Sequence, residues 1–165
     1  MAYKISKVRA FDKKVADAPG EMAKALAPIT AGRLNLLGVW GWTEGKSATI
    51  RICMQRVTPK QLSIINEAGF TEVPGTVVSI QCDNKPGVAQ TIGAATGEAD
   101  ASMEAFTGLA IGKQGATLAF FDDDKAADKA IKAVKGSEKK VSSAKKKSEK
   151  KKSAAKKKAA KKKAA

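Results

Sequence analysis

The hexapeptide Asp83-Asn84-Lys85-Pro86-Gly87-Val88 (DNKPGV) carries the strongest local signal for the fold. It follows an alternating apolar run, residues 76–82, and precedes a run whose apolar residues have helical spacing. It therefore predicts a strand, a tight turn and the start of a helix. Proline suits the first turn of a helix, and glycine allows a ligand or another backbone to approach closely. The backbone N–H groups at such a helix start favour a carboxylate or another anion.

A similar turn occurs earlier in the chain, at Asp17-Ala18-Pro19-Gly20-Glu21. Pro19 and Pro86 lie 67 positions apart, and the segments Ala48-Thr49-Ile50 and Ala116-Thr117-Leu118 lie 68 positions apart. A period of this length in a chain of 165 residues predicts an internal duplication.

Hydrophobic periodicity predicts the order strand, helix, strand, strand, helix, strand in each half of the body. The expected strands are 3–15, 34–43, 48–54, 70–73, 76–82, 100–111 and 116–121, and the expected helices are 21–30, 59–68, 88–96 and 122–136. Glycines are expected to end the helices, at Gly32, Gly69, Gly97 and Gly136. A slip in the alternation after Ile5 predicts a bulge in the first strand. The second half lacks an evident last strand, so its sheet edge is expected to be open or covered by a partner.

These elements predict an α+β protein made of two ferredoxin-like βαββαβ units in tandem, with helices on one face of an antiparallel sheet. The expected domains are residues 1–73 and 74–136, followed by a basic tail at 137–165. Residues 1–136 hold 17 of the 31 Lys and Arg and 14 of the 16 Asp and Glu, so the tail holds the remaining 14 Lys and two Glu. The overall charge of +15 therefore mostly describes the tail.

The composition argues against several classes of protein. The chain has no histidine, and it shows no nucleophile elbow, no Walker-type loop and no metal-ligand spacing, so neither an enzyme nor a cofactor is expected. It shows no signal peptide and no apolar run of about 18 residues. Cys53 and Cys82 could be bonded or free, and the preferred interpretation is that they are small buried hydrophobic residues. We expect a cytoplasmic protein, with association with the nucleoid as an alternative.

The turn Asn84-Lys85-Pro86-Gly87, the element order, its repetition and the triplet Leu34-Asn35-Leu36 at the start of an expected strand together resemble the ACT domain. The resemblance covers roughly residues 3–135 and extends to small stand-alone proteins made of two ACT domains. It implies a regulatory protein that binds an amino acid or a related metabolite, where the first turn of one domain faces the second strand of a neighbour. A homodimer is expected, and the absence of a long apolar run predicts no membrane partner.

Carried over position by position, the resemblance implies a set of ligand-binding residues. In the second half these are Asn84, Lys85, Pro86, Gly87, Val88 and Asp100, and in the first half they are Asp17, Pro19, Gly20, Glu21, Asn35 and Leu36. Asp17 and Glu21 depart from the family pattern, as does Asp100 in the triplet Ala99-Asp100-Ala101. One good site is therefore expected, which pairs the Asn84 turn with Asn35.

Some of these features also have simpler explanations. A Pro-Gly turn before a helix is commonly structural, and Asn35 could merely start a strand. Trp40 and Trp42 are expected in a core or an interface, with ligand stacking as the alternative. Three consecutive acids, 122–124, could suggest a metal but are expected to cap a helix. The candidate core residues of the second half are Met103, Phe106, Phe120 and Phe121.

The tail resembles the lysine- and alanine-rich tails of linker histones and bacterial histone-like proteins. Its composition predicts disorder in isolation and binding to DNA, RNA or another polyanion without sequence choice, with a solubilising extension as the alternative. The candidate nucleic-acid-binding residues are Lys145, Lys146, Lys147, Lys150, Lys151, Lys152, Lys156, Lys157, Lys158, Lys161, Lys162 and Lys163.

Three function classes follow from the sequence. The first is a non-enzymatic regulatory protein that binds an amino acid and carries a polyanion-binding tail. The second is a nucleic-acid-associated protein whose ACT-like body only drives oligomerisation. The third and least favoured is an enzyme.

Overall fold

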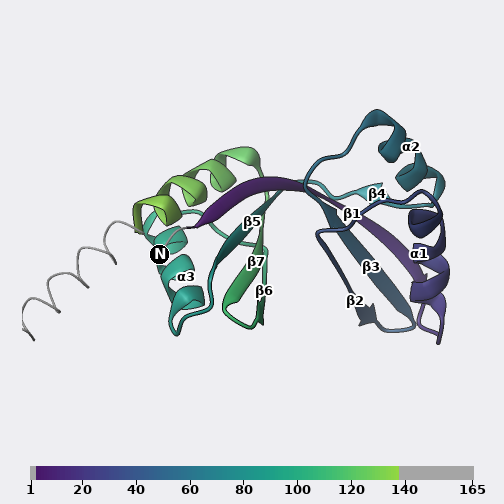
Figure 1. Ribbon diagram of the computed structural model, residues 1–165, viewed down its shortest axis with the longest axis horizontal. Helices are drawn as coiled ribbons and strands as arrows, with labels where there is room; N and C mark the ends of the chain where they lie inside the picture. The colour runs from purple at the N-terminus through teal and green to yellow at the C-terminus, as the bar shows by residue number, and fades with distance from the viewer. Residues whose placement is uncertain (1–2, 138–165) are drawn as a thin grey trace, which may run out of the picture.

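Strand β1 (Lys4–Ala16) runs through both halves of the molecule and joins them into one sheet. In this computed structural model, which describes residues 3–137, β1 forms the long bridge across the top of Figure 1. Residues Lys4–Val8 pair antiparallel with β5 (Thr76–Asp83), whereas Arg9–Ala16 pair antiparallel with β3 (Ser47–Met54). A single strand therefore forms part of both halves of the sheet.

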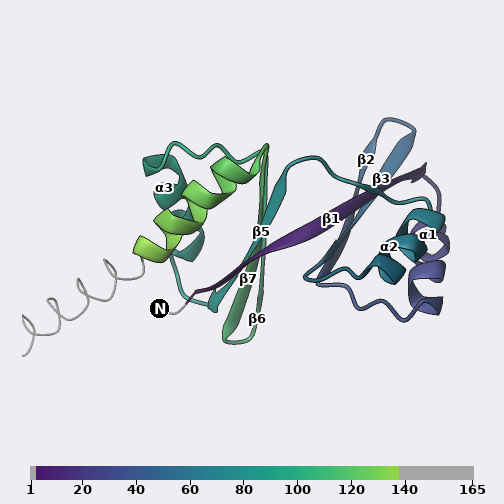
Figure 2. The same cartoon turned by 90° about the horizontal axis from the view of Figure 1, so that it is seen from above.

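The remaining elements flank this strand. They are α1 (Glu21–Ala31), β2 (Gly38–Glu44), α2 (Pro59–Glu67), β4 (Thr71–Glu72), α3 (Val88–Glu98), β6 (Ala105–Ile111), β7 (Gln114–Phe121) and a last helix, 124–137. The sheet order is β2-β3-β1-β5-β7-β6, and β4 pairs with the other side of β1. The result is a mixed α+β fold with a curled antiparallel sheet. Figure 2 shows α1 and α2 on one half and α3 with helix 124–137 on the other.

The N-terminal part of β1 corrects one expectation from the sequence. The first half has the order β2-β3-β1-β4, and the second has β6-β7-β5-β1, so residues 4–8 stand where a fourth strand was missing. The edge of β5 is therefore neither open nor left to a partner. Sequence reasoning missed this because it assigned all of β1 to the first half.

The alternation along β1 also differs from the prediction. Ile5 and Phe11 face the helices, whereas Val8 and Ala10 belong to a cluster on the opposite face of the sheet. Both pairings keep a constant register, so the strand has no inserted residue at the described pairs and the predicted bulge is wrong. The apparent slip arises because a different face of the strand becomes buried where its partner changes.

Two hydrophobic cores lie under the two helix pairs, and a third joins the halves. The third consists of Val8, Ala10, Cys53, Val77 and Phe120, with Trp40, Val73 and Leu118 packed against it. The Trp40 and Phe120 rings meet edge to face, with 5.6 Å between their centroids. The expectation of core packing is therefore confirmed for Trp40. It is wrong for Phe106, which is 38% exposed at the sheet edge.

Arg51 links the same two halves on this face. Its guanidinium donates twice to the carboxylate of Asp12, at 2.6 Å each, and lies over the rings of Trp42 and Phe120. The hydrogen bonds to Asp12 raise the pKa of Arg51 further above its usual value. The Arg51 side chain is only 15% exposed. Its contacts with Asp12 of β1 and Phe120 of β7 link β1 and β3 to β7.

The backbone conformation of the first half recurs in the second half at a spacing of 67 residues. Three pairs of residues with positive φ lie 67 positions apart: Gly20 and Gly87, Gly45 and Gly112, and Arg33 and Asp100. The pairs Gly41–Ile50 and Gly108–Thr117 hold the same place in the two hairpins, again 67 apart. Ile50 therefore corresponds to Thr117 and not to Leu118, so the alignment at 68 residues is displaced by one. Duplication as the origin of the repeat, and the boundary at 73/74, stay predictions.

Several observed element boundaries differ from the predicted ones. The expected strand at 34–43 begins only at Gly38, and that at 100–111 begins at Ala105. Helix α3 passes Gly97 to end at Glu98, and Gly136 lies inside helix 124–137. The capping box of Thr58 and Gln61 fixes the start of α2 at Pro59, the residue at which the helix is predicted to begin. No helix among residues 3–137 is long and apolar enough to cross a membrane.

Candidate functional site

A hollow of about 380 Å³ lies beside the turn that follows β5. The turn and the start of α3 form one wall, and β6 and β7 form the other. Its lining includes Asn84, Lys85, Gly87, Val88, Ala89, Phe106, Gly108, Leu109 and Thr117. The predicted turn residues are therefore brought together in one cavity, except for Pro86, which does not line it.

The local backbone explains why α3 begins at this hollow. Gly87 is the N-cap residue with φ 86°, a left-handed conformation that favours glycine. Pro86 thus precedes the cap and does not occupy the first helical turn, which corrects the sequence interpretation. No side chain caps this helix start, so the N–H groups of Ala89 and Gln90 are left for another acceptor. A carboxylate is the natural acceptor there, because the helix dipole adds to the attraction.

Asn84 and Lys85 are partly committed to local contacts. The Nδ2 of Asn84 donates to the carbonyl of Gly112 at 3.0 Å, which fixes the amide beside the β6–β7 turn. Lys85 Nζ donates to Asp83 Oδ2 at 2.6 Å, and this bond lowers the pKa of Asp83. The two charges balance each other, so the hollow carries little net charge from the turn.

The corresponding hollow in the first half is smaller, about 200 Å³. It is lined by Asp17, Glu21, Met22, Gly41 and Trp42 with parts of β1 and β3. Glu21 Oε1 accepts a hydrogen bond from Lys24 at 2.7 Å. Two carboxylates stand here in place of the amide and the apolar side chain of the second turn. This hollow is therefore poorly suited to an anionic group.

Asn35 does not line either hollow. It is exposed in the segment before β2, and Leu36 packs against the first core. Leu37, two residues further on, lines a groove of about 420 Å³ with Asp83, Leu109 and Ile111. The structure of one chain therefore does not bring Asn35 to the Asn84 turn, and their pairing between two copies stays a prediction.

The helix ends show that the second-half triplet was misaligned. Leu34 N–H donates to Ile29 O, and Ala101 N–H donates to Thr96 O, both pairs 67 positions apart. Leu34-Asn35-Leu36 thus corresponds to Ala101-Ser102-Met103. Asp100 stands in the place of Arg33, where both residues have positive φ. Asp100 is therefore a helix-end residue and not the counterpart of Asn35.

Sequence reasoning missed the wall made by Phe106, Gly108 and Thr117. One available signal was the glycine inside a predicted strand, which often marks a close approach of a ligand. The pairing of β6 with β7 places Phe106 and Gly108 on the face that looks toward α3, opposite Ala119 and Thr117. These residues face the turn because of the register in which β6 pairs with β7, which local sequence does not specify.

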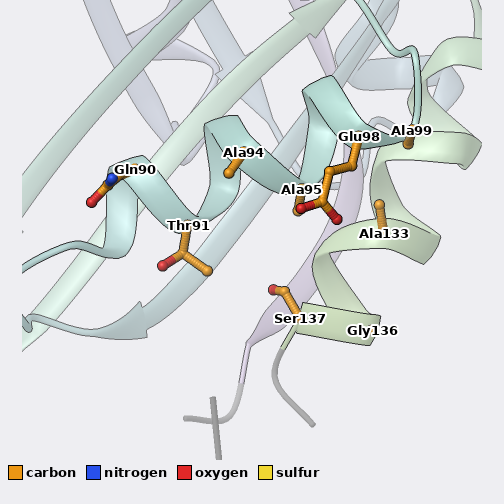
Figure 3. Close-up of a pocket in the computed structure, with 9 residues that line it drawn as sticks. All are labelled: Gln90, Thr91, Ala94, Ala95, Glu98, Ala99, Ala133, Gly136 and Ser137. Atoms are coloured by element: carbon orange, nitrogen blue, oxygen red, sulfur yellow. The ribbon is translucent and has the colours of Figure 1, made fainter. Parts of the chain in front are cut away.

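A second groove, of about 540 Å³, lies between α3 and helix 124–137 (Figure 3). Ala94, Ala95, Ala99, Ala133 and Gly136 give it a surface of small side chains. The hydroxyls of its polar residues serve their own helices: Thr91 donates to Gly87 O, and Ser137 donates to Val134 O. This groove therefore offers less recognition chemistry than the turn beside β5.

The other reactive side chains have structural roles. Asp123 accepts from the N–H of Ala126, which confirms the helix cap, and Asp124 accepts from Thr76 and Lys7. Both cysteines are free and buried, as preferred from the sequence. Burial raises the pKa of Cys53 to about 12, so its thiolate is negligible at neutral pH. The lysines of 145–163 lie outside the described residues.

The fold has known counterparts. A protein from Bacteroides thetaiotaomicron superposes with a TM-score of 0.62 at 17% identity, covering 82% of this chain and 90% of that one. The ligand-free regulatory subunit of aspartate kinase from Thermus thermophilus gives 0.59 at 15% identity, covering 82% and 95%. The fold is ACT-like. The corresponding subunit from Thermus flavus gives a TM-score of 0.56 at 14% identity, again covering 82% and 95%.

At these identities the likeness concerns the fold. No protein-family model matches the sequence, and no curated protein matches it. The two neighbours from Thermus are regulatory subunits of aspartate kinase. The function must therefore be inferred from this chain's own residues at the hollow beside β5.

Proposed function

We propose that this chain is a non-enzymatic regulatory protein of tandem ACT domains that binds a free amino acid or a related metabolite at the hollow beside β5. The observation that carries the proposal is the uncapped start of α3, which opens into a cavity of about 380 Å³. This combination offers anion-binding N–H groups next to an apolar space. An α-amino acid presents a carboxylate and a side chain that match these two features.

The binding mode follows from the groups that remain available. The ligand carboxylate accepts from the N–H of Ala89, which lines the hollow at the start of α3. The Oδ1 of Asn84 accepts from the ligand ammonium, since its Nδ2 already donates to Gly112. Asn35 of a second copy is the proposed further partner of the ammonium. The second-half hollow is the proposed site, because Asp17 and Glu21 disfavour a carboxylate in the first.

Oligomerisation provides the route from ligand to response. β2 and β6 stand at the two ends of the sheet order, and β6 presents Leu109 and Ile111 at 66% and 74% exposure. Exposed apolar edge strands favour association with another strand. We propose a homodimer in which ligand favours one arrangement of the two chains through its higher affinity for that arrangement.

Replacing Asn84 tests the binding mode. In the full chain, Asn84→Ala should weaken binding at least about 10-fold, because the ligand ammonium loses a charge-assisted acceptor. Isothermal titration with the amino acid that stabilises the chain most is the measurement. Asp17→Ala, at the matching position of the first half, should leave the affinity unchanged. Equal affinities for Asn84→Ala and the unchanged chain would contradict this role of Asn84.

The tail gives a second proposed activity. Its 14 Lys against two Glu in 29 residues favour binding to DNA, RNA or another polyanion. Lysine neutralises phosphate as a point charge, so affinity should not depend on sequence. The log–log dependence of affinity on salt should have a slope of about −0.9 per phosphate neutralised on duplex DNA. Unchanged DNA binding by a chain ending at residue 137 would contradict a role for the tail.

A further inference from the structure

The middle of β6 carries a glycine that the backbone does not require. Gly108 does not have a positive φ, so any residue could adopt its conformation. A Cβ built on Gly108 would meet Thr117 Cγ2 at 3.3 Å and Phe106 Cε1 at 3.8 Å, with no backbone atom closer than 3.9 Å. Glycine weakens a strand interior, so its use here calls for another reason. The space over Gly108 belongs to the hollow beside β5.

The matching glycine of the first half has a different environment. Gly41 stands in the same place of its hairpin, but a Cβ there would meet the carbonyl of Thr49 at 3.1 Å and Met22 Cε at 3.5 Å. Met22 thus lies over Gly41. The residue at the corresponding position of the second half is Ala89, so α3 places no long side chain over Gly108. This replacement agrees with the difference between about 200 Å³ and about 380 Å³.

We propose that Gly108 is a specificity-determining residue, and that the space over it receives the side chain of a neutral, apolar amino acid. This inference rests on the proposed amino-acid site and names its ligand class. The side chains of Val88, Ala89 and Phe106 line this space. The Thr117 hydroxyl donates to Ile80 O, so it is satisfied within the sheet. The charged residues at the turn, Asp83 and Lys85, are paired with each other at 2.6 Å, so a charged ligand side chain would lose water here without gaining a free partner.

The test uses a size series of amino acids: glycine, alanine, valine, leucine and phenylalanine. Their affinities are measured by isothermal titration for the full chain, for Gly108→Ala and for Gly41→Ala. Gly108→Ala should lower the affinity for the preferred larger amino acid about 10-fold or more and move the preference toward a smaller one. Gly41→Ala should change neither the affinity nor the order of preference. An unchanged order of preference in Gly108→Ala would overturn the proposal.

A second variant separates specificity from disturbance of β6. Ala89→Met places in the second half the side chain that stands over Gly41 in the first, and it keeps every backbone N–H. It should shift the preference in the same direction as Gly108→Ala. An equal loss of affinity for all five amino acids in both variants would also overturn the role of Gly108 in specificity. If the unchanged chain binds none of them and no other amino acid, the proposed function itself fails, which is a distinguishable result.

Discussion

Gly75→Ala should lower the free energy of unfolding by about 3 kcal/mol or more, one of the two largest effects expected from a single substitution in this chain. Gly75 has φ 89° between β4 and β5, where the chain passes from one half to the other. A Cβ at this residue would collide with the carbonyl oxygen of Phe121 and lie 3.2 Å from that of Asp122. Because both neighbours are backbone, neither can move aside without disturbing β7 or the turn after it.

Thermal unfolding of the full chain measures this effect. A loss of this size in a body of this length lowers Tm by roughly 10 °C. Gly20→Ala is the matched control, since Gly20 has φ 86° and nothing within 4 Å of its Cβ position. It should cost only the left-handed strain of about 1–2 kcal/mol. Equal changes in Tm for the two variants would show that the contact with Phe121 is unimportant.

Val8→Asp should destabilise the chain by about 3–5 kcal/mol or prevent folding, because it places an unpaired carboxylate in an apolar cluster. Val8 is 6% exposed and packs in the third core, among residues of both halves. It is also the last residue of β1 that pairs with β5, opposite Val77. The substitution therefore acts where the two parts of the sheet are joined.

The control for this prediction is Val39→Asp. Val39 lies on β2 at the sheet edge and is 42% exposed, so the same change should stay within about 0.5 kcal/mol. Urea unfolding of both full-length variants provides the comparison. If Val8→Asp were as stable as Val39→Asp, the third core would not hold the halves together.

The fold was largely predictable, because each half carries strong local signals. The Pro-Gly turns and the alternation of β3 placed most elements correctly. The division of β1 between two partners was not predictable in this way. Residues 4–8 pair with β5, which lies about 70 positions later, and no local pattern specifies a partner at such a separation.

The candidate site was predictable only in part. The turn at Asn84 was found because its residues are consecutive and carry a recognisable geometry. The opposite wall comes from β6, about 20 residues away, and depends on the register in which β6 meets β7. The misaligned triplet at Asp100 has a similar cause. Two irregular segments after helices look alike in sequence, and only their hydrogen bonds to the helix end fix the alignment.

Binding of a free amino acid in the hollow beside β5 underlies the whole proposed function. A thermal-shift screen of the full chain against the twenty amino acids tests it most directly. A ligand at 100 times its dissociation constant should add about 2.7 kcal/mol to the stability. For a body of this size we therefore expect Tm to rise by several degrees with one or a few neutral apolar amino acids. A Tm that no amino acid raises would contradict the claim and favour the nucleic-acid-associated alternative.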